Sequence, residues 1–261
     1  MRVDFLHALL SMLAFAGCAS SSGGVDASTT GPDAPGNTPG MPGIGAHGMH
    51  WYHLGQDPNR DSATSISTPA MDVQSSGSTI VVSVGRGSLG AFDLRGAVPT
   101  DNKGNSPYRQ VDETHKYDAW PSGTALYTYP SATGGSGFRV TTSTDDNDEI
   151  TIAAVEVTGA GRIQQYAWNQ VADSPNTSKS VTTTGPATLV AFWWGDGFPH
   201  DPQNATPNNG FTRIDTNAQE RDSFVQCAVA VKNVSAAGTY DVSWTPEPAQ
   251  GAQLWLVAVQ K

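Results

Sequence analysis

Short runs of β-branched and aromatic residues recur along the chain from His47 to its last residue, and Gly, Asn, Asp and Pro separate them. The clearest runs lie at 78–85, 124–129, 137–142, 149–157, 187–194, 211–215, 223–232, 239–244 and 252–260. Such runs are typical of β-strands, whereas no window of about eleven residues combines helical spacing with capping residues. The pattern predicts an all-β fold of about a dozen strands, a single antiparallel, jelly-roll-like β-sandwich over residues 47–261. A split into two smaller sandwiches near Asp173 to Thr177 stays open, although no internal repeat is visible to support it.

The N-terminal stretch has a different pattern, that of an export signal. Arg2 precedes an apolar run from Leu6 to Phe15, and two small residues, Ala16 and Gly17, lead to Cys18. The run is shorter than the roughly 20 apolar residues of a transmembrane helix. Residues 1–17 are therefore predicted to be a signal peptide.

Residues 15–18, Phe-Ala-Gly-Cys, resemble the lipobox of bacterial lipoproteins, with Phe15 in the place of the usual Leu. The resemblance implies cleavage before Cys18, acylation of its thiol and a stable membrane anchor. The alternative is an ordinary signal peptide followed by an incidental cysteine. Ala19 stands where, by analogy with enteric bacteria, an Asp would indicate retention at the inner membrane. We therefore expect an outer-membrane lipoprotein, with the leaflet left open.

A segment rich in Gly, Pro, Ser and Thr follows the cysteine and extends to Ala46. It contains too few large apolar residues to fold by itself. Residues 18–46 are therefore predicted to be a lipidated cysteine and a flexible tether that holds the β domain away from the membrane.

Charge and cysteine content narrow the classes of partner. The net charge is −10, and no basic cluster occurs in the sequence, which disfavours nucleic acid and anionic lipid headgroups. If Cys18 is lipidated, the second cysteine, Cys227, has no intramolecular disulfide partner. Cys227 alternates with Val225, Val229 and Val231, so we expect a buried and unreactive thiol.

Several segments of the β region resemble those of an uncharacterised group of exported bacterial β-sandwich proteins. These segments are DNKGNSPY (101–108), SGTALY (122–127), DEITIAAVEV (148–157) and GPATLVAFWWGDG (185–197). The resemblance implies export and a β-sandwich fold, and it implies no particular activity.

The most suggestive functional stretch is Trp193-Trp194 with the long segment 195–210 that follows it. Adjacent strand residues point to opposite faces, so one indole is expected to enter the core and the other to face solvent. An exposed indole beside Asp196, His200 and Asp201 has the composition of a sugar-binding surface. The alternative is that both tryptophans are packed and that the segment is a variable surface loop.

Three groups of residues suggest metal or acid/base chemistry. The acidic turn of Asp145, Asp146 and Asp148 offers oxygen ligands that suit Ca²⁺, with a solvated hairpin tip as the alternative. His47, His50 and His53 are candidates for a transition-metal site only if they converge, which strand geometry does not favour. Glu149 and Glu156 lie on opposite faces of one strand and cannot form a glycosidase pair, so Glu156 is either outward-facing or buried with a partner.

The sequence contains none of the common catalytic motifs of serine hydrolases, P-loop enzymes or zinc proteases, so whether the protein is an enzyme stays open. We expect an exported, lipid-anchored protein whose β-sandwich is a non-catalytic binding module for carbohydrate or an envelope polymer. A Ca²⁺-dependent jelly-roll hydrolase or lyase and a structural envelope protein are the alternatives.

Overall fold

The computed structural model describes residues 41–53, 64–87, 98–117, 122–144, 149–197, 202–220 and 225–261. All regular structure in these ranges is β, which confirms the all-β prediction. Accordingly, no helix in this part of the chain is long and apolar enough to cross a membrane. The strands form six sheets, and these separate sheets do not confirm a single jelly-roll-like sandwich.

Two large sheets contain the long apolar strands. Sheet 1 has the order β1 (Gly43–His53), β11 (Glu149–Thr158), β4 (Ser78–Gly87), β8 (Ser122–Ala132) and β6 (Arg109–Gln110), with β7 (His115–Lys116) also paired to β8. Sheet 2 has the order β12 (Arg162–Val171), β21 (Ala252–Gln260), β15 (Ala187–Gly195), β18 (Cys227–Val234) and β17 (Thr212–Thr216). All of their pairings are antiparallel.

Four small sheets cover the outer faces of the large ones. Over sheet 1 lie β2 (Ser65–Ser67), β10 (Val140–Ser143) and β5 (Thr100–Asp101), and the pair β3 (Met71–Val73) and β9 (Gly135–Phe138). Over sheet 2 lie β13 (Asn176–Thr177), β20 (Ser243–Glu247) and β16 (Asn204–Pro207), and the pair β14 (Val181–Thr183) and β19 (Gly238–Tyr240).

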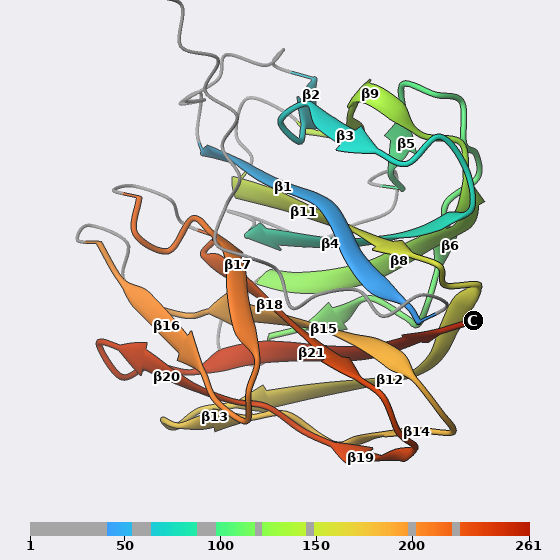
Figure 1. Ribbon diagram of the computed structural model, residues 1–261. Coiled ribbons are helices and arrows are strands. Elements are labelled where there is room, and N and C mark those ends of the chain that lie inside the picture. Colours follow the sequence, from blue (N-terminus) through green and yellow to red (C-terminus); the bar gives the residue numbers. More distant parts are fainter. Residues whose placement is uncertain are drawn as a thin grey trace, which may run out of the picture. The chain divides into compact units, whose positions relative to one another are not determined.

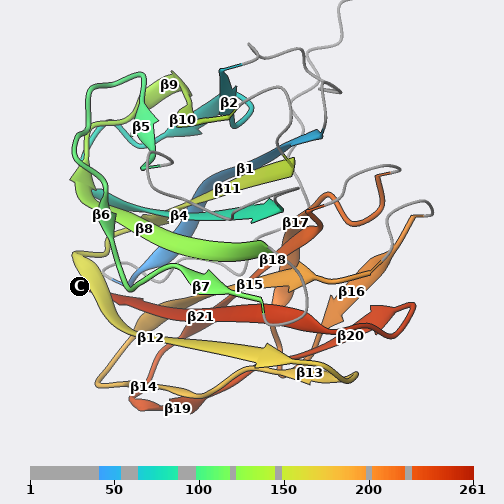
Figure 2. The same ribbon diagram turned by 180° about the vertical axis from the view of Figure 1, so that it is seen from behind.

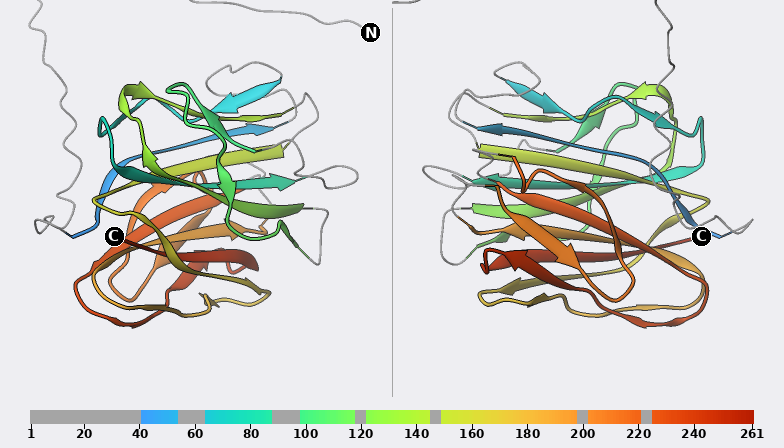
Figure 3. Two further views of the ribbon diagram at one scale, coloured as in Figure 1. Left: turned by 90° about the vertical axis from the view of Figure 1, so that its right-hand side faces the viewer. Right: turned by 60° about the vertical axis from the view of Figure 1, so that its left-hand side comes forward.

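Apolar residues form three cores between the resulting four layers (Figures 1 and 3). One core lies under each set of cover strands, and the third lies between sheets 1 and 2. The middle core joins Val81 and Leu126 of sheet 1 to Phe192, Trp194 and Trp255 of sheet 2. Each large sheet is therefore buried on both faces, which explains why its strands are continuous apolar runs rather than alternating ones.

The two halves of the β region repeat one topology. If β7 is set aside, the strands of the second half, taken in chain order, occupy the same places in their sheets as those of the first half. The correspondence holds for the large sheets and for both kinds of cover sheet. Residues 43–158 are hereafter repeat 1, and residues 162–260 are repeat 2. Both lie within one compact unit, Pro35–Lys261.

Equivalent side chains make equivalent bonds in the two repeats. In repeat 1, Thr68 donates its amide to the carbonyl of Val140 at 2.9 Å, and its hydroxyl accepts the amide of Val140 at 3.1 Å. In repeat 2, Ser178 and Val242 exchange the same two bonds at 2.9 and 3.1 Å. The topology was not visible as a sequence repeat because such positions require only a hydroxyl or a residue of suitable size, not an identical residue.

A second equivalent pair fixes each edge strand to its cover. His50 of β1 donates from Nδ1 to the Ser67 carbonyl at 2.6 Å, and Asn169 of β12 donates from Nδ2 to the Thr177 carbonyl at 2.8 Å. The boundary between the repeats therefore lies at 159–161, not near Asp173 to Thr177. Strand β1 begins at Gly43, so the last residues of the predicted tether belong to the sheet.

The tryptophan pair Trp193-Trp194 matches the alternative interpretation, in which both indoles are packed. Both indoles are buried, with exposed fractions of 0% and 3%. They do point to opposite faces of β15, but Trp193 enters the core under the cover strands and Trp194 enters the middle core. The expectation that one indole faces solvent is wrong because both faces of this central strand are covered.

Trp194 packs against Gly85 of the opposite large sheet, where any larger side chain would overlap the indole ring. Its Nε1 donates to the Ser83 hydroxyl at 3.2 Å. Trp193 donates from Nε1 to the Asn176 side chain at 2.8 Å. Both tryptophans therefore have satisfied, structural environments.

Candidate functional site

Strand β12 forms one edge of sheet 2 and has an unusual composition. After its first residue, Arg162, it contains amides and two aromatic residues but no further charged residue. Gln165 and Asn169 bond to cover strands, accepting from the Thr182 amide and donating to the Thr177 carbonyl respectively. The alternate residues, Tyr166, Trp168 and Gln170, therefore lie on the face toward sheet 1.

Repeat 1 meets this face through β7, as Figure 2 shows beside β21 and β12. The His115 ring stacks on the Trp168 ring, with centroids 4.1 Å apart and planes 7° apart. The same imidazole meets the Trp255 ring edge-on at 5.0 Å. His115 is therefore held between two indoles of the other repeat.

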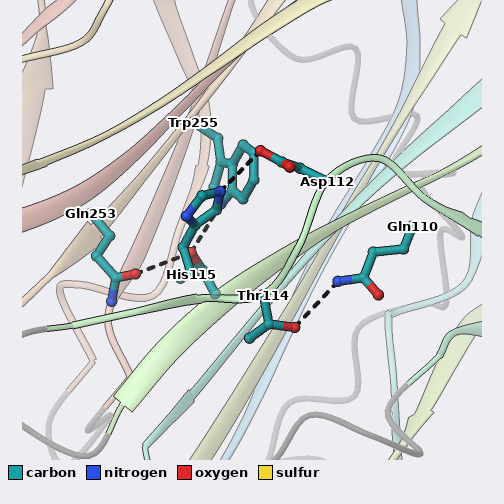
Figure 4. A network of polar contacts seen from close by, with 7 residues as sticks. Gln110, Asp112, Thr114, His115, Gln253 and Trp255 are labelled. Atoms are coloured by element: carbon teal, nitrogen blue, oxygen red, sulfur yellow. Dashed lines mark hydrogen bonds and ion pairs between the residues drawn. The ribbon is translucent and has the colours of Figure 1, made fainter.

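A polar network fixes the imidazole and the ring beneath it (Figure 4). His115 donates from Nε2 to Asp112 Oδ2 at 3.0 Å. Trp255 donates from Nε1 to the Thr124 hydroxyl at 2.9 Å, and that hydroxyl donates to Gln253 Oε1 at 3.3 Å. Asp112 lies in the insertion between β6 and β7, so this carboxylate is an addition to the common topology.

The other end of this edge carries a second carboxylate. Tyr117, two residues after His115, donates its hydroxyl to Asp196 Oδ2, and Asp196 directly follows β15. Burial raises the pKa of the Asp196 carboxyl, and the hydrogen bond from Tyr117 opposes that rise. We call the surface formed by Asp112, His115, Tyr117, Tyr166, Trp168 and Asp196 the aromatic edge.

The aromatic edge remains accessible. Tyr166 is 38% exposed and is one of the two exposed large apolar side chains among the described residues. Trp168, His115 and Asp196 are half-buried. Partly exposed rings next to carboxylates and amides can stack on a flat ligand face and hydrogen-bond to the groups around its rim.

The pseudo-equivalent edge, formed by β1 and β17, is different. Strand register places His47, Met49 and Trp51 where β12 has Tyr166, Trp168 and Gln170. Trp51 is 8% exposed and donates from Nε1 to Glu220 Oε2 at 2.6 Å, and His47 Nδ1 lies 3.4 Å from Asp215 Oδ2. We call His47, Trp51, Asp215 and Glu220 the clamp edge.

The histidine triplet does not converge. His47 contacts Asp215, His50 bonds to the Ser67 carbonyl, and His53 lies 3.6 Å from Glu149. Across the part of the chain that the structure describes, no three His, Cys, Asp or Glu side chains form a group that could hold a metal ion. The predicted Ca²⁺ ligands Asp145, Asp146 and Asp148 lie outside the described residues.

Glu156 is buried with partners, one of its two predicted alternatives. It is 2% exposed, and its oxygens accept from the Ala46 amide at 2.8 Å, the Gln74 amide at 2.9 Å and the Ser78 hydroxyl at 2.5 Å. The bond to Ala46 holds β1 against β11, and the bonds to Gln74 and Ser78 hold the β3–β4 turn. The carboxylate therefore has a structural role. The equivalent position in repeat 2 is Ala258.

Cys227 is buried in the middle core with Val229 and Val231, as predicted. Burial raises the pKa of its thiol well above the ordinary value, and the nearby Asp215 carboxylate adds to the rise. A thiol that stays protonated is a poor nucleophile, so Cys227 is a core residue.

Of the residues predicted to bind a ligand, Asp196 lies at the aromatic edge, Trp193 and Trp194 are in the cores, and His200 and Asp201 lie outside the described residues. Cys18 also lies outside them. Sequence reasoning missed His115, Tyr166 and Trp168. The available signal was the uncharged run QQYAWNQ, in which amides alternate with aromatic residues.

Searches for similar proteins returned no match for this chain among family models, curated proteins or solved structures.

Proposed function

We propose that the chain is an exported, lipid-anchored lipoprotein of the bacterial cell envelope whose β region is a non-catalytic binding module for carbohydrate. The observation that carries the binding role is the aromatic edge, where Tyr166 and Trp168 present rings beside the amide of Gln170. The targeting part of the proposal rests on residues 1–18 and on their resemblance to a lipoprotein signal.

The chemistry of the aromatic edge suits a sugar better than the other polymers of a cell envelope. Sugar rings have apolar faces that stack on aromatic side chains and hydroxyl rims that bond to amides and carboxylates. A nucleic acid would meet the net charge of −10 and the carboxylates of Asp112 and Asp196, which repel phosphates. Carbohydrate is therefore the proposed ligand class.

The binding role is tested with the full-length chain in mild detergent against insoluble polysaccharides and envelope polymers. We expect depletion of the protein from solution without the appearance of new polymer chain ends. New chain ends that disappear with EDTA would instead support the Ca²⁺-dependent hydrolase or lyase. If neither depletion nor new chain ends appear, a structural envelope protein becomes the better explanation.

A pair of tyrosine variants locates the binding surface. Tyr166→Ala removes the exposed ring of the aromatic edge, and Tyr240→Ala removes a partly buried ring of the outer cover strands as a matched control. Because a stacked aromatic contact contributes about 0.5–1.5 kcal/mol, Tyr166→Ala should weaken binding roughly threefold to tenfold. Equal binding by Tyr166→Ala and the unmodified chain would contradict the proposed site.

The anchor is tested separately. Cys18→Ser should abolish incorporation of labelled fatty acid and release the protein from the membrane fraction, because no thiol remains to be acylated. Fatty-acid labelling that persists in this variant would contradict the lipoprotein interpretation without affecting the binding role.

A further inference from the structure

We infer that the end of the aromatic edge formed by Tyr117 and Asp196 is a site for a protonated amine, so that the preferred ligand is a glycan with free amino groups. This inference rests on the proposed carbohydrate-binding function and specifies its ligand.

The Asp196 carboxylate has one oxygen that can accept a further hydrogen bond. Oδ2 accepts the Tyr117 hydroxyl, and Oδ1 accepts no hydrogen bond from any residue in the described ranges. The Asp196 amide donates to the Gly251 carbonyl at 3.1 Å, which fixes the backbone that carries the side chain. A held, half-buried carboxylate with one unused oxygen is a strong acceptor for a charged donor.

Glycine at position 251 is required for this arrangement. A side chain there would place its first carbon 2.7 Å from the Tyr117 hydroxyl oxygen and 3.2 Å from Asp196 Oδ2. The first of these separations is shorter than ordinary contact allows. The hydroxyl and the carboxylate therefore remain together at the start of β21 only because residue 251 has no side chain.

The charge of the aromatic edge favours a cation. Its ionisable groups other than the tyrosines are Asp112, Asp196 and His115. Its two carboxylates outnumber its single imidazole, so the surface is acidic. The facing residues of β12 and β21, Gln170 and Gln253, are uncharged. An ammonium group would relieve the cost of keeping Asp196 ionised while half-buried.

The spacing suits one continuous ligand. Tyr117 and His115 are two residues apart in an extended segment, which corresponds to about 7 Å. An ammonium at Asp196 can therefore belong to the same oligosaccharide as a sugar ring stacked near Trp168. The aromatic rings also attract a cation electrostatically, which a neutral or acidic sugar does not exploit.

The test compares two oligosaccharides with one backbone, the glucosamine hexamer and its fully N-acetylated form, at a pH where the free amines are protonated. Isothermal titration with the full-length chain should show about tenfold tighter binding of the glucosamine hexamer, because a charge-assisted bond replaces a neutral one. Asp196→Asn should abolish this preference, so that the two hexamers bind the variant with equal affinity.

Asp72→Asn, which removes one carboxylate from the exposed cover of repeat 1, controls for net charge and should keep the preference. Equal affinity of the unmodified chain for the two hexamers would overturn the inference, as would a preference that survives in Asp196→Asn or binding of neither hexamer. If the acetylated hexamer binds and Tyr166→Ala weakens that binding, the proposed function holds even when the amine site fails.

Discussion

The aromatic edge and the clamp edge occupy equivalent places in the two repeats, but they use their side chains differently. At the clamp edge, Glu220 accepts the indole N–H of Trp51 and Asp215 contacts His47, so carboxylates bind groups of the other repeat. At the aromatic edge, Tyr166 keeps an exposed ring, and Asp196 keeps an oxygen that receives no bond from described residues.

If the aromatic edge binds a ligand, as proposed, the difference shows how a repeated fold can separate stability from recognition. Contacts at both edges link the repeats, since His115 stacks on Trp168 and Tyr117 donates to Asp196 at the aromatic edge. The aromatic edge nevertheless keeps the exposed ring of Tyr166 and a carboxylate oxygen of Asp196 that accepts no bond from the described residues. This division predicts that substitutions at the two edges have opposite effects on stability and on binding.

The largest effect is expected at Glu156, which bonds to β1 and whose place in repeat 2 is taken by Ala258. Glu156→Ala should lower the free energy of unfolding by about 3 kcal/mol, because it leaves the Ala46 and Gln74 amides and the Ser78 hydroxyl without their acceptor. Chemical denaturation measures this loss. Glu156→Gln, which keeps one acceptor oxygen, should lose less, and a loss below about 1 kcal/mol in the alanine variant would contradict the fastening role.

A smaller effect is expected at the clamp edge. Trp51→Phe removes the donor to Glu220 but keeps most of the buried ring, so the free energy of unfolding should fall by about 1–2 kcal/mol. Tyr166→Ala at the aromatic edge is the comparison and should change stability by less than about 0.5 kcal/mol. Equal losses in the two variants would remove the distinction between the edges.

The smallest effect is a pH dependence at the aromatic edge. The pKa of Asp196 is raised in the folded chain, so the folded state holds this proton more tightly than the unfolded state. Stability due to this group is therefore greatest at acidic pH and falls as pH rises through the folded-state pKa. Asp196→Asn should raise the thermal midpoint at neutral pH relative to the unmodified chain, and the difference should shrink on acidification. A pH-independent difference would contradict this account.

The central strands of the two large sheets were predictable from the sequence. The run at 252–260 coincides with β21, and those at 149–157 and 187–194 lie within β11 and β15, because buried central strands are continuous β-branched and aromatic runs. The edge strand β12 was not identified, since its glutamines and asparagine have low strand propensity and acquire their conformation by pairing with β21.

The aromatic edge was harder to predict for a related reason. His115, Trp168 and Asp196 are far apart in the sequence and meet only because the repeats pack sheet against sheet. Asp196 was identified from its position after the tryptophan pair, but one indole of Trp193 and Trp194 was expected to face solvent because the second covering layer was not anticipated. Without a visible repeat, nothing in the pattern of residues indicated that both faces of β15 are buried.

If the chain is tethered through Cys18 and binds a polymer, as proposed, the attachment of Glu156 to Ala46 has a mechanical consequence. Any pull exerted on a bound polymer would enter the folded region at Gly43, the first residue of β1. The carboxylate bond to the Ala46 amide lies three residues inside that point and connects the strand to β11 behind it. It therefore opposes the separation of β1, the outermost strand of sheet 1, at the end where the force is applied.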